Sequence, residues 1–253
     1  MKTANSPTPV LDVREITVHF GGITALSNVT ISVPPGARYG ILGPNGAGKT
    51  TLYNVISGFI RPATGRVMVD GIDVTSWPAH RRVRQGLART FQITTLFPAL
   101  TALENVMMGT LAQLGHHNNF WRPARRDRAA LERAVALLDE LGLGDLASAP
   151  VRELSYGQQR QLEVALALAT RPRLLLLDEP TAGLSAAETH SVCQLVGRLP
   201  AELTVVIIEH DLDVIFEIAD YISVLHQGER IAEGPSQVVQ RDPVVKEVYL
   251  GGR

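Results

Sequence analysis

Gly43-Pro-Asn-Gly-Ala-Gly-Lys-Thr50 is the stretch of sequence that decides the fold. The pattern around it predicts a short apolar strand at residues 38–42 and a helix at residues 50–60. In such a strand–loop–helix unit, backbone amides and the positive end of the helix converge on phosphate oxygens. The predicted phosphate-binding loop consists of Gly43, Pro44, Asn45, Gly46, Ala47, Gly48, Lys49, Thr50 and Thr51.

Two side chains of this loop have specific predicted roles. Lys49 is placed to reach the β and γ phosphates of a nucleotide, and the Thr50 hydroxyl is placed to ligate Mg²⁺. The alternative is a Gly-rich surface turn that matches the pattern by chance, but such a turn requires neither the preceding strand nor the following helix. The loop therefore predicts binding of a nucleoside triphosphate with magnesium.

Two acids follow a second apolar strand. Residues 174–177 are four leucines, and Asp178 and Glu179 come directly after them. Open α/β proteins bind ligands at the carboxyl ends of such strands. We predict that Asp178 binds Mg²⁺ and that Glu179 deprotonates or orients the attacking water. A helix cap before Pro180 is the alternative; it explains one acid, but not the apolar strand behind it.

His210 and Gln92 are two further candidates. His210 follows the β-branched run at residues 204–208, where we predict a γ-phosphate contact; an ordinary strand-end histidine is the alternative. Gln92 lies where strand-like sequence gives way to helical sequence, and its amide is placed to reach the metal or the water. A solvated loop glutamine is the alternative there.

The fold class follows from where strand and helix patterns alternate. Residues 11–40 contain short β-rich runs separated by Gly and Pro turns, which predicts an antiparallel layer. Later apolar strands alternate with helices, which predicts a mainly parallel sheet flanked by helices. We predict an α/β phosphate-loop NTPase core with an N-terminal antiparallel β layer and an inserted helical subdomain. The expected single domain spans residues 9–250, with core and β layer at 9–92 and 160–250, the subdomain at 93–159, and a flexible N-terminus at 1–8.

Composition excludes several classes of protein. The chain has 253 residues and a formal net charge of -1, so it has no broad basic surface for nucleic acid. Its single cysteine, Cys193, excludes an internal disulfide, and we expect it in the core or on a helix face. No run of about 18 apolar residues occurs, so we expect no membrane-spanning helix and no secretory signal.

One short segment adds a more specific resemblance. Residues 154–158 are Leu-Ser-Tyr-Gly-Gln, and they lie between the phosphate loop and the acidic strand, in the order found in one class of ATPase. With Gln92 as the Q-loop and His210 as the switch histidine, the chain resembles the ATP-binding subunit of an ABC transporter over nearly its whole length. In that family an aromatic residue stacks on adenine, and Phe20 is the matching position. Packing of Phe20 under the sheet edge is the alternative.

The resemblance implies a site shared between two subunits. Two such domains would form a head-to-tail sandwich, homomeric or heteromeric, with each ATP held between one subunit's phosphate loop and the other subunit's signature. The matching signature residues are Leu154, Ser155, Gly157 and Gln158. A hydroxyl, bare backbone amides and a positive helix end would face the γ-phosphate there. An ordinary serine N-cap is the alternative.

Further motifs resemble the branched-chain amino-acid importers. They are Phe20-Gly-Gly-Ile-Thr-Ala-Leu26, Gly86-Leu-Ala-Arg-Thr-Phe-Gln92, Leu100-Thr-Ala-Leu-Glu-Asn-Val106, Ile208-Glu-His-Asp211 and the ending at residues 242–251. The resemblance implies an ATPase on the cytoplasmic face of the membrane, held there by permease subunits and served by a solute-binding protein. The implied cofactors are ATP and Mg²⁺, and the implied cargo is a branched-chain amino acid or a related small polar solute.

Some positions depart from the family pattern or fit more than one role. Ala182-Gly-Leu-Ser185 lacks the acid that relatives usually carry in this loop, and Leu166 stands where an arginine is frequent. Residues 115–128 cluster arginines around Phe120 and Trp121, and they either contact the permease or anionic headgroups or form a solvated loop. The alternative functions are a non-transport ABC ATPase with soluble partners, or a kinase with the same phosphate loop.

Overall fold

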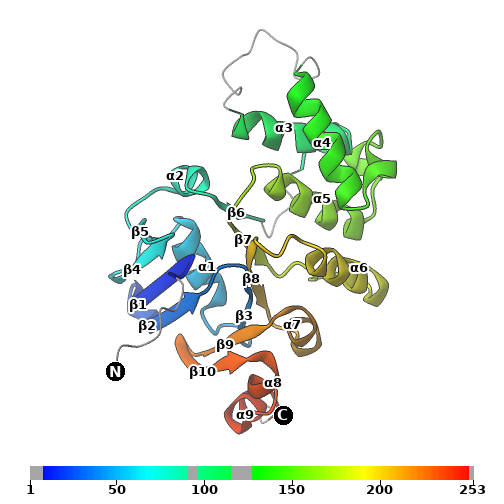
Figure 1. Cartoon of the computed structure of the whole chain (residues 1–253). Coiled ribbons are helices and arrows are strands. Elements are labelled where there is room, and N and C mark those ends of the chain that lie inside the picture. The colour runs from blue at the N-terminus through cyan, green and yellow to red at the C-terminus, as the bar shows by residue number, and fades with distance from the viewer. Residues whose placement is uncertain (1–7, 91–95, 115–126, 251–253) are drawn as a thin grey trace. The chain divides into compact units, whose positions relative to one another are not determined.

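The computed structural model describes residues 8–90, 96–114 and 127–250, which form two compact units. Unit 1 contains the described residues within 1–89, 173–179 and 200–253, and unit 2 those within 90–172 and 180–199. Figure 1 shows that unit 1 holds the β-sheets and that unit 2 is helical. The predicted α/β fold class, with its antiparallel layer and mainly parallel sheet, is confirmed.

A six-stranded sheet forms the centre of unit 1, in the order β10-β9-β3-β8-β7-β6. The pairs from β9 to β6 are parallel, and only β10 runs antiparallel to its neighbour. The strands are β3 (Arg38–Leu42), β6 (Leu87–Arg89), β7 (Leu174–Asp178), β8 (Thr204–Glu209), β9 (Tyr221–His226) and β10 (Glu229–Pro235). β7 and β8 are buried along their whole length, as expected for parallel strands covered on both faces.

Two helices of unit 1, α1 (Lys49–Ser57) and α7 (Leu212–Ile218), cover opposite faces of this sheet. Tyr39 and Ile41 of β3 belong to the same buried cluster as Leu52 and Ile56 of α1. Gly40 points the other way, because successive residues of a strand alternate between faces. A Cβ atom at Gly40 would lie 2.8 Å from Cγ1 of Ile215, so glycine lets α7 approach β3 closely.

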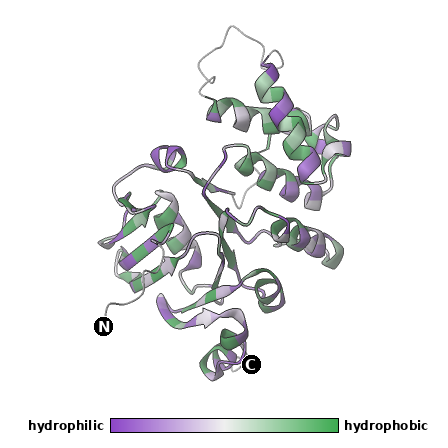
Figure 2. Ribbon diagram, in the orientation of Figure 1, coloured by the Kyte–Doolittle hydropathy of each residue, from purple (hydrophilic) through white to green (hydrophobic). Residues whose placement is uncertain are grey.

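An antiparallel sheet lies against the same core. Its strand order is β2-β1-β4-β5, formed by β1 (Leu11–Phe20), β2 (Ile23–Val33), β4 (Thr64–Val69) and β5 (Ile72–Asp73). Hydrophobic and hydrophilic bands alternate along these strands in Figure 2, and the buried set includes Val13, Ile16 and Val67. Short helices complete unit 1: α2 (Ala79–Arg84), α8 (Ser236–Val239) and α9 (Pro243–Leu250).

In its described residues, unit 2 contains four helices and two 3₁₀ turns. They are α3 (Ala102–Gln113), α4 (Arg128–Glu140), η3 (Gly144–Leu146), η4 (Val151–Glu153), α5 (Tyr156–Leu168) and α6 (Ala186–Gly197). The helices α3, α4 and α5 share one apolar cluster, which includes Val106, Leu138 and Leu162. α5 packs through this cluster and α6 contacts α5, so both helices belong to unit 2. Most of α5 and all of α6 lie outside residues 93–159, the range predicted for the helical subdomain.

The structure also bears on the predictions made for Cys193 and for membrane-spanning helices. Cys193 is buried in α6, as expected for a core residue. None of the helices in the described part of the chain is both long enough and apolar enough to span a membrane.

Candidate functional site: a phosphate loop and three strand ends

Three neighbouring parallel strands of unit 1 end at the same edge of the sheet. β8 lies between β3 and β7, with Leu42 opposite Glu209 and Asp178 opposite Ile208. The phosphate loop follows β3, Asp178 and Glu179 end β7, and His210 follows β8. Residues that are far apart in the sequence therefore meet where ligands bind in open α/β sheets.

The phosphate loop requires glycine at specific positions. Gly46 and Gly48 have φ values of +81° and +99°, in the left-handed region that favours glycine. A Cβ atom at Gly48 would lie 2.7 Å from the carbonyl oxygen of Ala25. The loop is also fixed through Ala47, whose carbonyl oxygen accepts a hydrogen bond of 3.1 Å from the amide of Gly228. Backbone of the β layer and of the β9–β10 turn thus shapes the loop.

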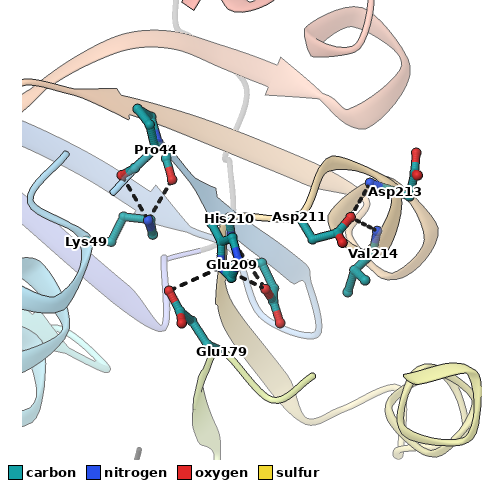
Figure 3. Close-up of polar contacts among 9 residues, drawn as sticks. Pro44, Lys49, Glu179, Glu209, His210, Asp211, Asp213 and Val214 are labelled. Carbon is teal, nitrogen blue, oxygen red and sulfur yellow. Dashed lines mark hydrogen bonds and ion pairs between the residues drawn. The ribbon is translucent and has the colours of Figure 1, made fainter. Parts of the chain in front are cut away.

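Lys49 places a buried cation at this edge. Its Nζ donates to the carbonyl oxygens of Gly43 at 2.6 Å and Pro44 at 3.1 Å. Figure 3 shows the contact with Pro44. Burial lowers the pKa of Lys49, and the neighbouring carboxylates of Glu179, Asp178 and Glu209 oppose that shift. The ammonium group of Lys49 therefore lies near these carboxylates, and its N–H groups can donate hydrogen bonds to a phosphate that binds at the loop.

The helix after the loop begins with free donor groups. Lys49, Thr50 and Thr51 form the first turn of α1, and the N-cap residue Gly48 has no side chain that could cap them. Thr50 is exposed. A helix start without a side-chain cap, with an exposed threonine in its first turn, is the arrangement that binds anions at helix N-termini.

Asp178 is a buried acid, 4% exposed, at the end of β7. Burial and the adjacent Glu179 raise its pKa to about 6, while Arg89 and Lys49 act in the opposite direction. A divalent cation beside this carboxylate would favour its ionised form. Asp178 and the Thr50 hydroxyl are oxygen ligands of the type that Mg²⁺ prefers, with further positions left to phosphate and water. These residues fit a magnesium ion bound together with a nucleotide.

Glu179, His210 and Glu209 form a group at the ends of β7 and β8 (Figure 3). Nδ1 of His210 lies 3.3 Å from Oε1 of Glu179 and 3.9 Å from Oε2 of Glu209. The backbone of Glu179 is left-handed, with φ of 44°, and its amide donates to the carbonyl oxygen of Ile208 at 2.9 Å. A strained residue fixed in this way is typical of functional sites.

Two residues of this region were missed by sequence reasoning. Glu209 is completely buried, and its Oε2 accepts a hydrogen bond from the amide of His210 at 3.3 Å. Arg89 donates to Ser57 of α1 at 2.8 Å and lies over the ring of Phe59 at 3.8 Å. The sequence offered a signal for Glu209, because it is an acid at the end of an apolar strand. It offered none for Arg89, because the strand β6 has only three residues and therefore no recognisable pattern.

The remaining predictions concern Phe20, Gln92 and the arginine-rich segment. Phe20 ends β1 and is 51% exposed, so it does not pack beneath the sheet edge. Gln92 and residues 115–126 of the arginine-rich segment lie outside the described residues, and their predicted roles remain predictions.

In unit 2, the signature residues form the start of α5. Leu154 is buried, and Ser155 is the N-cap residue, whose Oγ accepts a hydrogen bond from the amide of Gln158. The Gln158 side chain accepts from the amide of Ser155 in return, which completes a capping box. Ser155 therefore caps a helix, as the alternative for this segment expected, and the amide of Gly157 faces the side chain of Glu188 in α6.

Comparison with known proteins identifies the family. The family model described as ABC transporter matches residues 26–182, which include the phosphate loop, the signature and the acidic strand. The chain belongs to the ABC transporter family. A second model, described as branched-chain amino acid ATP-binding cassette transporter, matches residues 229–253 of this ABC protein. The predicted family and the predicted subgroup are both confirmed.

Curated relatives cover almost the whole ABC chain. It is 40% identical to the high-affinity branched-chain amino acid transport ATP-binding protein BraF of Pseudomonas aeruginosa, over 96% of this chain and 98% of the relative. It is 36% identical to the corresponding protein LivG of Escherichia coli, again over 96% of this chain and 98% of the relative.

Solved structures of ABC cassettes have the same fold. The ADP conformation of the ATP-binding cassette MJ1267 matches with a TM-score of 0.87 at 34% identity, over 97% of this chain and all of that chain. A dimeric post-hydrolysis state of the cassette MJ0796, bound to ADP and Pi, matches with a TM-score of 0.73 at 30% identity, over 89% and 98% of the two chains.

Proposed function

We propose that this chain is the ATP-binding and ATP-hydrolysing subunit of an ABC importer. The observation that carries the proposal is the meeting of the phosphate loop, the acidic pair and His210 at three adjacent strand ends. A kinase would use the loop in the same way, but it would have no evident use for the signature segment at the start of α5.

The phosphates of ATP bind at the loop. Amides of the loop and of the first turn of α1 surround the β and γ phosphates, and Lys49 exchanges the carbonyl oxygens of Gly43 and Pro44 for phosphate oxygens. Phe20, with half of its surface exposed, stacks on the adenine.

Hydrolysis follows from the two acids and the histidine. Thr50, Asp178 and Gln92 would hold Mg²⁺, which would offset the negative charge of the phosphate oxygens. Glu179 orients and deprotonates the attacking water, and His210 holds Glu179 through Nδ1 while it contacts the γ-phosphate. The fixed backbone of Glu179 limits the positions that its carboxylate can take.

A second cassette completes the site. The signature presents the Gly157 amide, the Ser155 hydroxyl and the start of α5 to the γ-phosphate of another subunit. The dimeric structure of the relative MJ0796 supports this arrangement by analogy. Closing of the ATP sandwich and its reopening after hydrolysis drive permease subunits, which hold this chain at the cytoplasmic face of the membrane.

The proposed cargo is a branched-chain amino acid or a related small polar solute, delivered to the permease by a solute-binding protein. The names of the relatives BraF and LivG and the match at residues 229–253 support this class. The net charge of -1 does not favour a nucleic-acid partner.

Co-purification with the membrane partner tests the proposal. The tagged chain is isolated from its native membranes, the complex is reconstituted in vesicles with the cognate binding protein, and uptake of radiolabelled leucine is followed with and without ATP. We expect permease subunits in the complex and ATP-dependent uptake that is lost in Glu179→Gln. Recovery with soluble partners alone would favour the non-transport ABC ATPase.

A further inference from the structure

One carboxylate of unit 2 bridges the starts of two helices. Glu188 lies in the first turn of α6, and its Oε2 accepts hydrogen bonds from the amide of Ser185 at 3.1 Å and from its hydroxyl at 2.8 Å. Its Oε1 accepts from the amide of Gly157 at 3.1 Å and from the hydroxyl of Ser155 at 3.3 Å. Glu188 therefore caps α6 with one oxygen and contacts the signature with the other.

Glycine at position 157 permits this contact. A Cβ atom there would lie 2.8 Å from Cγ and 2.9 Å from Oε1 of Glu188, closer than side chains normally approach. The pKa of Glu188 is lowered by the hydrogen bonds from Ser185 first, and then by those from Gly157 and Ser155. The group beside the signature is thus an ionised carboxylate at neutral pH, close to the positive end of α5.

The donors that Glu188 engages are the donors assigned above to the γ-phosphate of a second subunit. Both ligands are anions, and one amide hydrogen cannot serve both at full strength. We propose that Glu188 is an internal competitor of the γ-phosphate: it occupies the signature in the separate subunit and sets the ATP concentration at which the sandwich closes. The inference rests on the proposed function, because it needs ATP from another subunit to reach this signature.

The geometry allows the Glu188 carboxylate to release the signature without losing its cap on α6. When a phosphate arrives, Oε1 releases Gly157 and Ser155, while Oε2 keeps its two bonds to Ser185. The cap of α6 therefore persists in both states. Since Glu188 is partly exposed, its contact with the signature is worth little, and the expected effect of removing it is several-fold rather than orders of magnitude.

A purely structural role for Glu188 makes the opposite prediction. If the carboxylate only held α5 and α6 in position for ATP, removing it would weaken closing of the sandwich. If it competes with ATP, removing it strengthens closing. The direction of the effect therefore separates the two roles.

The experiment measures ATP-driven dimerisation in a Glu179→Gln background, in which hydrolysis is blocked. The fraction of dimer is followed by light scattering as MgATP is added, and binding of ATP to the phosphate loop is measured separately with a fluorescent ATP analogue. Glu188→Gln keeps an acceptor oxygen and removes the charge. Glu188→Asp keeps the charge but shortens the side chain, and Glu188→Ala removes both. Glu132→Gln is the matched control, because it removes one exposed carboxylate elsewhere in unit 2.

We expect Glu188→Gln and Glu188→Ala to lower the ATP concentration for half-maximal dimerisation by about three- to tenfold, with Glu188→Asp in between. The control and the affinity of the phosphate loop for the ATP analogue should not change. A dimer that forms equally well, or less well, in all Glu188 variants would overturn the inference and leave the proposed function intact. Failure of the parent to bind ATP would overturn both, and failure of a parent that binds ATP to dimerise at saturating MgATP would overturn the inference alone.

Discussion

The strand-end site of unit 1 and the signature of unit 2 handle charge in opposite ways. In unit 1, the buried Asp178 and Glu209 act to raise the pKa of Lys49, while Lys49 acts to lower the pKa of Asp178. In unit 2, Ser155 and Gly157 offer neutral donors at a helix start, and their one charged neighbour is Glu188 among the partners that the structure describes.

This contrast shows how the work is divided within the chain. In the proposed mechanism, the acids, the base and the lysine of phosphoryl transfer all belong to the strand-end site, so we expect the chemistry in unit 1. The signature offers hydrogen-bond donors and a helix dipole, so we propose that it recognises a phosphate held by another subunit. Substitutions at the strand ends should therefore lower the rate of turnover, and substitutions at the signature should change assembly of the dimer.

The largest effect is expected at the base. Glu179→Gln should lower the rate of ATP hydrolysis by about 10³-fold, because the amide cannot accept the proton of the attacking water. Binding of ATP should remain. The rate is measured by phosphate release under single-turnover conditions, with Glu217→Gln, an exposed acid of the same unit, as the control. Turnover at the parent rate would remove Glu179 from this role.

A smaller loss is expected at His210. His210→Ala removes the group 3.3 Å from Glu179, and hydrolysis should fall by about 10- to 100-fold, since the base stays but loses its partner. His210→Gln, which keeps a hydrogen-bond donor, should recover part of the rate. Equal rates for both variants would show that the contact with Glu179 is not what matters.

Substitution of Asp178 should change the free energy of unfolding as well as the activity. Its pKa is raised to about 6 in the folded protein, so the native state binds a proton more tightly than the unfolded chain. This contribution favours folding at low pH and is lost as pH rises through about 6. Asp178→Asn should therefore be more stable than the parent by about 3 kcal/mol above pH 7, in the absence of metal, with the difference vanishing below about pH 4.

Urea unfolding at a series of pH values measures that difference. A gap between the Asn variant and the parent that stays constant with pH would contradict the raised pKa. Adding Mg²⁺ with ATP should reverse the order of stability, because the parent binds the metal and the variant does not.

The smallest effect is expected at the adenine contact. Phe20→Ala should raise the Kd for ATP by about tenfold, because stacking on an aromatic ring is worth about 1–3 kcal/mol in nucleic-acid binders. The melting temperature should stay the same, since the ring is 51% exposed. Ile23→Ala is the matched control, because Ile23 pairs with Phe20 across the hairpin and is 72% exposed. Equal affinities for the two variants would argue against stacking.

The sequence predicted the local structure of both regions well. The strand before the phosphate loop, the leucine strand at residues 174–177 and the helix after the signature each have a strong apolar pattern or cap, and the structure contains them as β3, β7 and α5. These features depend on residues close together in the chain, where propensity and periodicity carry the information.

What could not be predicted depends on long-range packing. The order of the sheet places β8 between β3 and β7, and no local pattern encodes this. The burial of Glu209 follows from that order, because a strand-end acid otherwise appears solvated. Glu188 and Gly157 are 31 positions apart in the sequence, and their contact arises from the packing of α5 against α6.

The division between the two units is best tested by mixing two inactive variants. Lys49→Ala disables the strand-end site but leaves the signature intact. Ser155→Asp keeps a good N-cap but places a negative charge where the γ-phosphate would bind. In a mixed dimer, the intact loop of one chain meets the intact signature of the other.

The steady-state rate of ATP hydrolysis is measured for each variant alone and for a 1:1 mixture. If the strand-end site and the signature act in different subunits, the mixture should recover about a quarter of the parent rate, because about half of the dimers are mixed and each has one complete site. If the mixture is as inactive as its two components, the signature does not complete the site of a second chain.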